Sequence, residues 1–153
     1  MIPWETVKDD FRWDGSLRDI YITPATMDDW GAVYVLLRDY PDAEFLVDGG
    51  KQPLPPKTER IFELHATSSP MLRIQAGRAL VVFHFLSSEE VECDVDPREV
   101  VSQADLDALL GFVRQLGEAT KKKVVITPEN LRSEPIISYS PETGAFQYHQ
   151  AVI

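Results

Sequence analysis

The sequence predicts an α+β fold, with a mainly antiparallel β-sheet of five or more strands packed by two principal α-helices. Three observations carry this prediction. Strand-like runs follow one another at residues 71–76, 80–86 and 90–95, two segments have the caps and periodicity of helices, and two further runs flank a hairpin turn near residue 143. With 153 residues, the chain suits a single globular domain, 1–153.

The three central runs are joined by very short connections, Gly77-Arg78 and Ser87-Ser88. Connections of this length permit antiparallel hairpins, whereas a parallel crossover needs a dozen or more residues. We therefore expect these three runs to be neighbours in one antiparallel sheet.

The clearest helix is predicted at residues 27–38. Thr26 is a suitable N-cap, and Asp28 and Asp29 lie in the first turn, where the helix dipole favours negative charge. Its apolar stripe comprises Met27, Trp30, Val33, Tyr34 and Leu37. This stripe should be buried on one face of the sheet.

A second helix is predicted at residues 103–116. Ser102 caps it, and Asp105 at the third helical position can reach back to the cap. Gly111 costs about 1 kcal/mol relative to alanine inside a helix, which indicates close backbone packing nearby. Gly117 is the expected end of this helix.

The remaining elements are expected to be short. They are a helix over 3–11, strands over 17–22, 43–50, 123–127, 135–140 and 145–152, and a capped helical turn over 127–131. Residues 58–66 fit either a helical turn or a strand, and the helix is favoured. A proline-rich loop over 51–57 cannot join a central ladder.

The composition excludes several classes of function. A net charge of −10 and a pI near 4.7 oppose binding to nucleic acid or to an anionic membrane, since both need Lys and Arg to neutralise phosphates. No apolar run approaches the roughly 20 residues of a membrane span, and no secretory signal is visible at the start. Cys93 is the only cysteine, so an intramolecular disulfide is excluded, and a reducing, cytoplasmic location is expected.

Acidic residues are concentrated in "EEVECDVDPREV", residues 89–100. As a strand this segment alternates, with Val91, Cys93 and Val95 on one side and Glu90, Glu92, Asp94 and Asp96 on the other. Cys93 is then a small, unreactive core residue, because a reactive thiol needs a nearby cation and the local charges have the opposite sign.

The acidity continues to residue 107. Between 89 and 107 the chain has eight acidic residues and one base, Arg98, so this window carries −7 of the net −10. Dense like charges repel one another, and binding a basic protein is the simplest use for them. The predicted partner-binding residues are Glu90, Glu92, Asp94, Asp96, Glu99, Asp105 and Asp107. The alternative interpretation is a solvated acidic surface.

No catalytic residue, metal site or cofactor is predicted. Same-side carboxylates of a strand lie roughly 6.8 Å apart, too far for neighbours to share a small cation, and no calcium-loop pattern occurs. His65, His84 and His149 have no metal-ligand spacing. A small site becomes conceivable if His84 and His149 meet across the sheet.

These observations favour a small acidic cytoplasmic protein-binding protein, in its concrete form an immunity or inhibitor-type protein that neutralises a basic partner. A chaperone for a secreted protein would share the same features. A small enzyme or ligand-binding protein with a dispersed carboxylate and histidine site is the alternative from another class, though the sequence weighs against an enzyme. A self-associating structural protein is a further alternative. No motif points to a known family.

Overall fold

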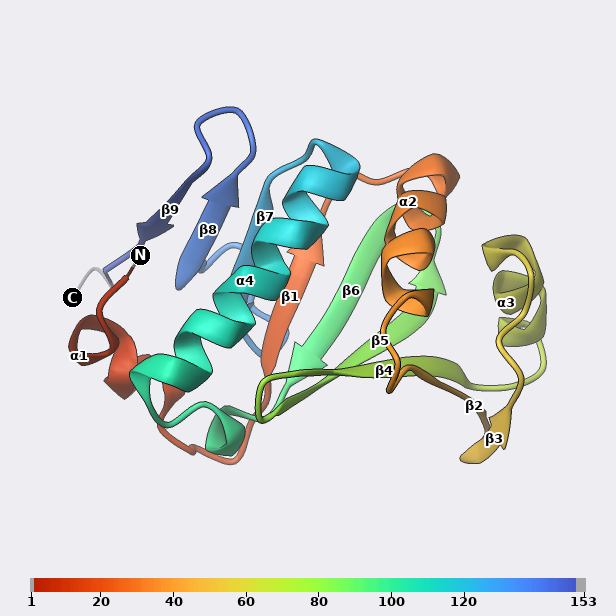
Figure 1. Cartoon of the computed structure of the whole chain (residues 1–153), viewed down its shortest axis with the longest axis horizontal. Helices are drawn as coiled ribbons and strands as arrows, with labels where there is room; N and C mark the ends of the chain where they lie inside the picture. The colour runs from red at the N-terminus through yellow and green to blue at the C-terminus, as the bar shows by residue number, and fades with distance from the viewer. Residues whose placement is uncertain (1, 151–153) are drawn as a thin grey trace.

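Nine strands form one sheet in which every neighbouring pair is antiparallel, as the computed structural model of this chain describes for residues 2–150 (Figure 1). The strand order is β3-β2-β4-β5-β6-β1-β7-β8-β9. The bounds are β1 (Arg18–Ile22), β2 (Glu44–Val47), β3 (Gly50–Gln52), β4 (Pro70–Ala76), β5 (Ala79–Ser87), β6 (Glu90–Val95), β7 (Val124–Pro128), β8 (Ile137–Ser140) and β9 (Ala145–Tyr148). The predicted α+β class with an antiparallel sheet is confirmed, and the three central runs pair as hairpins.

The three longest helices lie on one face of this sheet (Figure 1). The helical segments are α1 (Trp4–Val7) with its continuation η1 (Lys8–Phe11), α2 (Met27–Arg38), α3 (Thr58–His65), η2 (Pro97–Glu99) and α4 (Gln103–Thr120). In α2 the predicted cap is present, because the Thr26 side chain accepts a hydrogen bond from the Asp29 amide and the Asp29 carboxylate accepts one from the Thr26 amide. Among residues 2–150, none of the helices combines the length and apolar character that a membrane span requires.

The core lies between these helices and the sheet. The apolar residues of α2 and α4 are buried against the alternate, inward residues of β1, β5, β6 and β7. Trp30 of α2 is fully buried, and its ring contacts Phe83 and Phe85 of β5 together with Phe62 of α3. Its indole N–H donates to the carbonyls of Ser87 and Glu90, which fixes the turn between β5 and β6.

Helix α4 begins as predicted but ends later. The Ser102 hydroxyl accepts from the Asp105 amide at 3.2 Å, whereas the Asp105 carboxylate accepts from the amide of Val101, one residue before the cap. The helix continues through Gly117 to Thr120, and Lys121 ends it in the left-handed conformation with φ of 58°. The predicted end at Gly117 is therefore wrong.

Gly117 has a packing role inside the helix. A Cβ atom at this position would lie 2.5 Å from Cδ2 of Tyr139, so glycine lets the buried tyrosine ring approach the helix backbone. The close packing predicted around Gly111 is absent, because nothing lies within 4 Å of a Cβ built there. Close packing at a glycine of this helix is therefore present, but it occurs at Gly117 and not at Gly111.

Two short segments also differ from the predictions. Residues 127–131 form no helical turn, because Thr127 and Pro128 continue β7 and pair with Asp19 and Arg18 of β1. The segment after Val47 turns back as β3, an edge strand that pairs with β2 alone. The predicted strand over 145–152 extends beyond the described residues, and within them β9 covers 145–148 and ends before His149.

Candidate functional site

The face of the sheet opposite the helices is the candidate site, and we call it the open face. On β4, β5 and β6 its side chains are partly buried, whereas the intervening side chains are fully buried in the core. Strand pairing places its central residues in two rows of cross-strand neighbours. One row is Glu44, Arg73, Val82, Asp94, Asp19 and Thr127, and the other is Leu46, Met71, His84, Glu92, Tyr21 and Val125.

Carboxylates gather where β6 and β1 meet on this face. Asp94 of β6 is the direct cross-strand neighbour of Asp19 of β1, and Glu92 of β6 lies opposite Tyr21. Asp19 is buried, with 3% of its surface exposed. Like charges directly opposite each other destabilise a sheet, so these carboxylates need partners from neighbouring strands and loops.

His84 of β5 supplies one such partner. Its Nε2 lies 2.7 Å from Oδ2 of Asp94. This hydrogen bond to Asp94 raises the pKa of His84 above its ordinary value, and the negative charge of Asp94 adds to the effect against the opposing effect of burial. A protonated His84 then offsets part of the repulsion between Asp94 and Asp19.

Stability should consequently depend on pH through His84. Because the folded-state pKa is raised, its contribution to the free energy of unfolding is complete below the unfolded value of about 6.5 and is lost as the pH rises through the folded pKa. His84→Gln is expected to cost about 1–2 kcal/mol at pH 6 and less at pH 8. Urea unfolding at a series of pH values measures this, and an equal cost at both ends would contradict it.

The Tyr21 hydroxyl lies between two carboxylates of this cluster, those of Asp19 and Glu92. It donates to Oδ2 of Asp19 at 2.8 Å and lies 3.3 Å from Oε1 of Glu92. Burial raises the pKa of the Tyr21 hydroxyl well above its ordinary value, and the two carboxylates raise it further. Burial also raises the pKa of Glu92, helped by the charges of Asp19 and Glu90.

Residues 129–136 connect β7 to β8 and cross the open face, and we call residues 129–135 the strap. The Asn130 amide donates to Oδ2 of Asp19 at 2.8 Å. Arg132 donates to both carboxylate oxygens of Glu90, at 2.8 and 2.6 Å, and its guanidinium carbon lies 4.9 Å from the centroid of the Tyr21 ring. The strap thus covers the carboxylate of Asp19 on β1 and reaches the start of β6.

Sequence reasoning missed Asp19, Tyr21 and Arg132. The available signal was an aspartate inside the strand "RDIYI", where Asp19 and Tyr21 share one side of the strand. Polar groups that are buried must be hydrogen-bonded, so this strand required partners from elsewhere.

The seven predicted partner-binding residues divide into two groups. Glu90, Glu92 and Asp94 lie together on the open face. The remaining four lie at the end of β6 or on the helix side of the sheet, and each has its own partner. Asp96 pairs with Arg98 and caps η2, Glu99 accepts from the Leu80 amide, Asp105 accepts from the Val101 amide, and Asp107 accepts from the Gln103 side chain.

The two candidate histidines lie apart. His84 is on β5 and His149 follows β9, with β6, β1, β7 and β8 between their strands. His149 Nε2 lies 2.8 Å from the Ser138 hydroxyl. The conceivable site that would join both histidines is therefore not formed, and His84 belongs instead with the open-face carboxylates.

Cys93 lies in the core as predicted. It is fully buried, its neighbours Val91 and Val95 are buried beside it, and burial raises the pKa of its thiol well above the ordinary value. The alternation of β6 predicted from the sequence is confirmed. Within the described range 2–150, no group of three or more His, Cys, Asp or Glu side chains could hold a metal ion.

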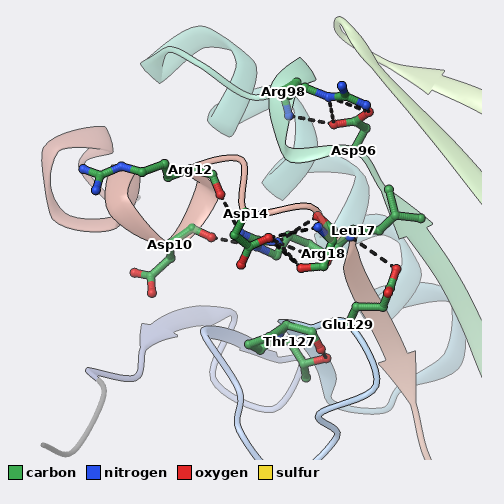
Figure 2. Close-up of polar contacts among 11 residues, drawn as sticks. Asp10, Arg12, Asp14, Leu17, Arg18, Asp96, Arg98, Thr127 and Glu129 are labelled. Atoms are coloured by element: carbon green, nitrogen blue, oxygen red, sulfur yellow. Dashed lines mark hydrogen bonds and ion pairs between the residues drawn. The ribbon is translucent and has the colours of Figure 1, made fainter.

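The position of β1 depends on a buried arginine at its first residue (Figure 2). Only 4% of the Arg18 side chain is exposed. Its guanidinium donates to the backbone carbonyl of Asp10 in η1 and to those of Arg12, Ser16 and Leu17 in the loop that precedes β1. It also lies 3.3 Å from the carboxylate of Asp14. The Glu129 carboxylate at the start of the strap accepts from the Leu17 amide beside this network.

The carboxylates of β1 and β6 make the open face rich in hydrogen-bond acceptors and in negative charge. Such a face is suited to bind cations and hydrogen-bond donors. Comparison with protein-family models, with curated proteins and with solved structures finds no match to this chain.

Proposed function

We propose that this protein binds a basic protein partner on its open face. The observation that carries the proposal is the gathering of the partly exposed Glu92 and Asp94 beside the buried Asp19, on adjacent strands of a face that no helix of residues 2–150 covers. Cross-strand carboxylates work against the stability of the sheet itself. A cationic partner relieves their repulsion on binding, and complementary charge accelerates its encounter with this face.

Apolar side chains beside the carboxylates support the same proposal. Met71, Leu80 and Val82 are partly exposed on β4 and β5, and Leu86 at the end of β5 is 58% exposed. Protein interfaces combine an apolar centre with polar and charged groups that set register and specificity. The open face offers both within a few strands.

The proposal is tested by comparing two variants that lose the same charge. One carries Glu90→Gln, Glu92→Gln and Asp94→Asn on the open face, and its matched control carries Glu5→Gln, Glu59→Gln and Glu142→Gln at exposed positions elsewhere. Each is used with the unchanged protein to capture partners from an extract of the source organism, and association with the purified partner is then timed. We expect the open-face variant to associate about tenfold or more slowly at low salt, and the control to resemble the unchanged protein.

Two outcomes would overturn the proposal. The first is a captured basic protein whose association slows equally in both variants, because net charge would then explain the effect. The second is an association rate of the open-face variant that matches that of the unchanged protein at low salt. Urea unfolding of all three proteins ensures that the comparison is made between folded chains.

The narrower proposal is that the partner is a basic enzyme, which this protein neutralises in the manner of an immunity or inhibitor protein. The acidity of the chain and the binding role proposed for the open face support it. An equimolar amount of this protein should then abolish the partner's activity. A partner that is a secreted protein, bound before it folds, would favour the chaperone role instead.

A further inference from the structure

Arg132 fills a site that is made by residues far from it in sequence. The strap carries Arg132 onto Glu90, 42 positions away along the chain, where its Nε and Nη2 donate to the two carboxylate oxygens at 2.8 and 2.6 Å. Its guanidinium also lies over the Tyr21 ring, with 4.9 Å from Cζ to the centroid. Two parallel hydrogen bonds to one carboxylate and an aromatic face suit the planar guanidinium, whereas an ammonium group cannot match both.

The site is held firmly by the rest of the fold. Tyr21 is 1% exposed and its hydroxyl is hydrogen-bonded to Asp19, so the ring has a fixed position. Only 15% of the Glu90 side chain is exposed, and the Glu90 carbonyl accepts from the buried indole of Trp30 at 3.2 Å. A carboxylate this buried is costly to leave without a partner.

The group that fills the site is much less buried. Residues 130–134 of the strap are all exposed, and 57% of the Arg132 side chain is exposed. The strap is tied to the open face by Arg132 and by the Asn130 amide, which donates to Asp19. Lifting the strap would therefore uncover Asp19 and Tyr21 while breaking few contacts of its own.

We propose that Glu90 and Tyr21 form a guanidinium-binding site, which Arg132 occupies in the free protein and which an arginine of the basic partner occupies in the complex. This inference rests on the proposed function and names the side chain by which the partner is recognised. Exchange of one arginine for another leaves Glu90 paired throughout. It also opens the strap, so that the carboxylates beneath it become available to the partner.

The test removes Arg132 and offers the site a free guanidinium. In Arg132→Ala, we expect the Asn130 amide to exchange with solvent at least about threefold faster, because the strap has lost one of its two ties. Millimolar N-methylguanidine should bind the vacant site, shift the NMR signals of the Tyr21 ring, and slow the Asn130 exchange again. Methylammonium at the same concentration should do neither.

Two control variants make the result specific. Arg60→Ala removes an exposed arginine paired with Glu63, so N-methylguanidine should leave the Tyr21 signals of this variant unchanged. Arg132→Ala combined with Glu90→Gln should lose the response to N-methylguanidine. The inference is overturned if methylammonium acts as well as N-methylguanidine, or if Arg132→Ala shows no response at Tyr21. Either of these failures would leave the proposed function standing, since that is tested by association of the partner with the open-face variant.

Discussion

Arg18→Met is expected to lower the free energy of unfolding by about 3 kcal/mol or more. The Arg18 guanidinium is almost fully buried and donates to four backbone carbonyls, that of Asp10 in η1 and those of Arg12, Ser16 and Leu17 in the loop between η1 and β1. Methionine has a similar length but no donor, so these carbonyls would lose the partner that the buried guanidinium supplies. Each buried acceptor left unpaired costs about 1–3 kcal/mol.

Urea unfolding followed by circular dichroism measures this loss. The matched control is Arg12→Met in the same loop, where the arginine is 75% exposed and pairs with an equally exposed Asp9. Exposed pairs contribute about 0–1 kcal/mol, so the control should unfold close to the unchanged protein. Similar losses in the two variants would contradict the role assigned to Arg18.

Gly117→Ala and Gly111→Ala are expected to change stability in opposite directions, although both lie inside α4. Alanine is about 1 kcal/mol better than glycine in a helix. At position 111 nothing lies within 4 Å of the added Cβ, so this gain should appear in full. At position 117 the added Cβ would lie 2.5 Å from the Tyr139 ring, and overpacking typically costs about 1–3 kcal/mol.

The Tyr139 ring has little freedom to move away. It is 1% exposed, packs against Phe146 at 4.8 Å between ring centroids, and its hydroxyl donates to Glu118. The variants Gly117→Ala and Gly111→Ala are compared by the midpoint of urea unfolding. The free energy of unfolding should depend on urea concentration with the same slope in both, which checks that they unfold in the same way. A stabilised Gly117→Ala would show that the ring finds another position.

The parts of the fold that were predictable are those with a strong local signal. The strands around Gly77 and Ser88 follow from alternation and short connections, and α2 follows from its capping residues. The end of α4 was missed because Gly117 has the appearance of a terminating glycine. Glycine is needed at this position because the ring of Tyr139, 22 positions later, packs against the helix backbone. No local sequence pattern predicts that contact.

The candidate site was also predictable only where it depends on a local sequence pattern. The side of β6 that carries Glu90, Glu92 and Asp94 follows from alternation within one strand. Their partners come from β5, β1 and the strap, and the pairing of β1 with β6 joins residues 69 to 77 positions apart. The register between distant strands depends on how their side chains pack in the core, and this packing cannot be inferred from a single sequence.

The central place of β1 has a consequence for the order in which the chain acquires its structure. Arg18 pairs with Val95, 77 positions later, and with Pro128, 110 positions later. Within residues 2–150, β1 is the strand that links the ladder ending at β6 to the ladder beginning at β7. During synthesis β1 therefore leaves the ribosome long before either neighbour, while the hairpins of β4, β5 and β6 can form from nearby residues. Pairing over such distances is slow, because the chain loses the entropy of loop closure before the stabilising contacts between the strands form. The two ladders become one sheet only after β7 has emerged, which makes the pairing of β1 with β7 a late step of folding.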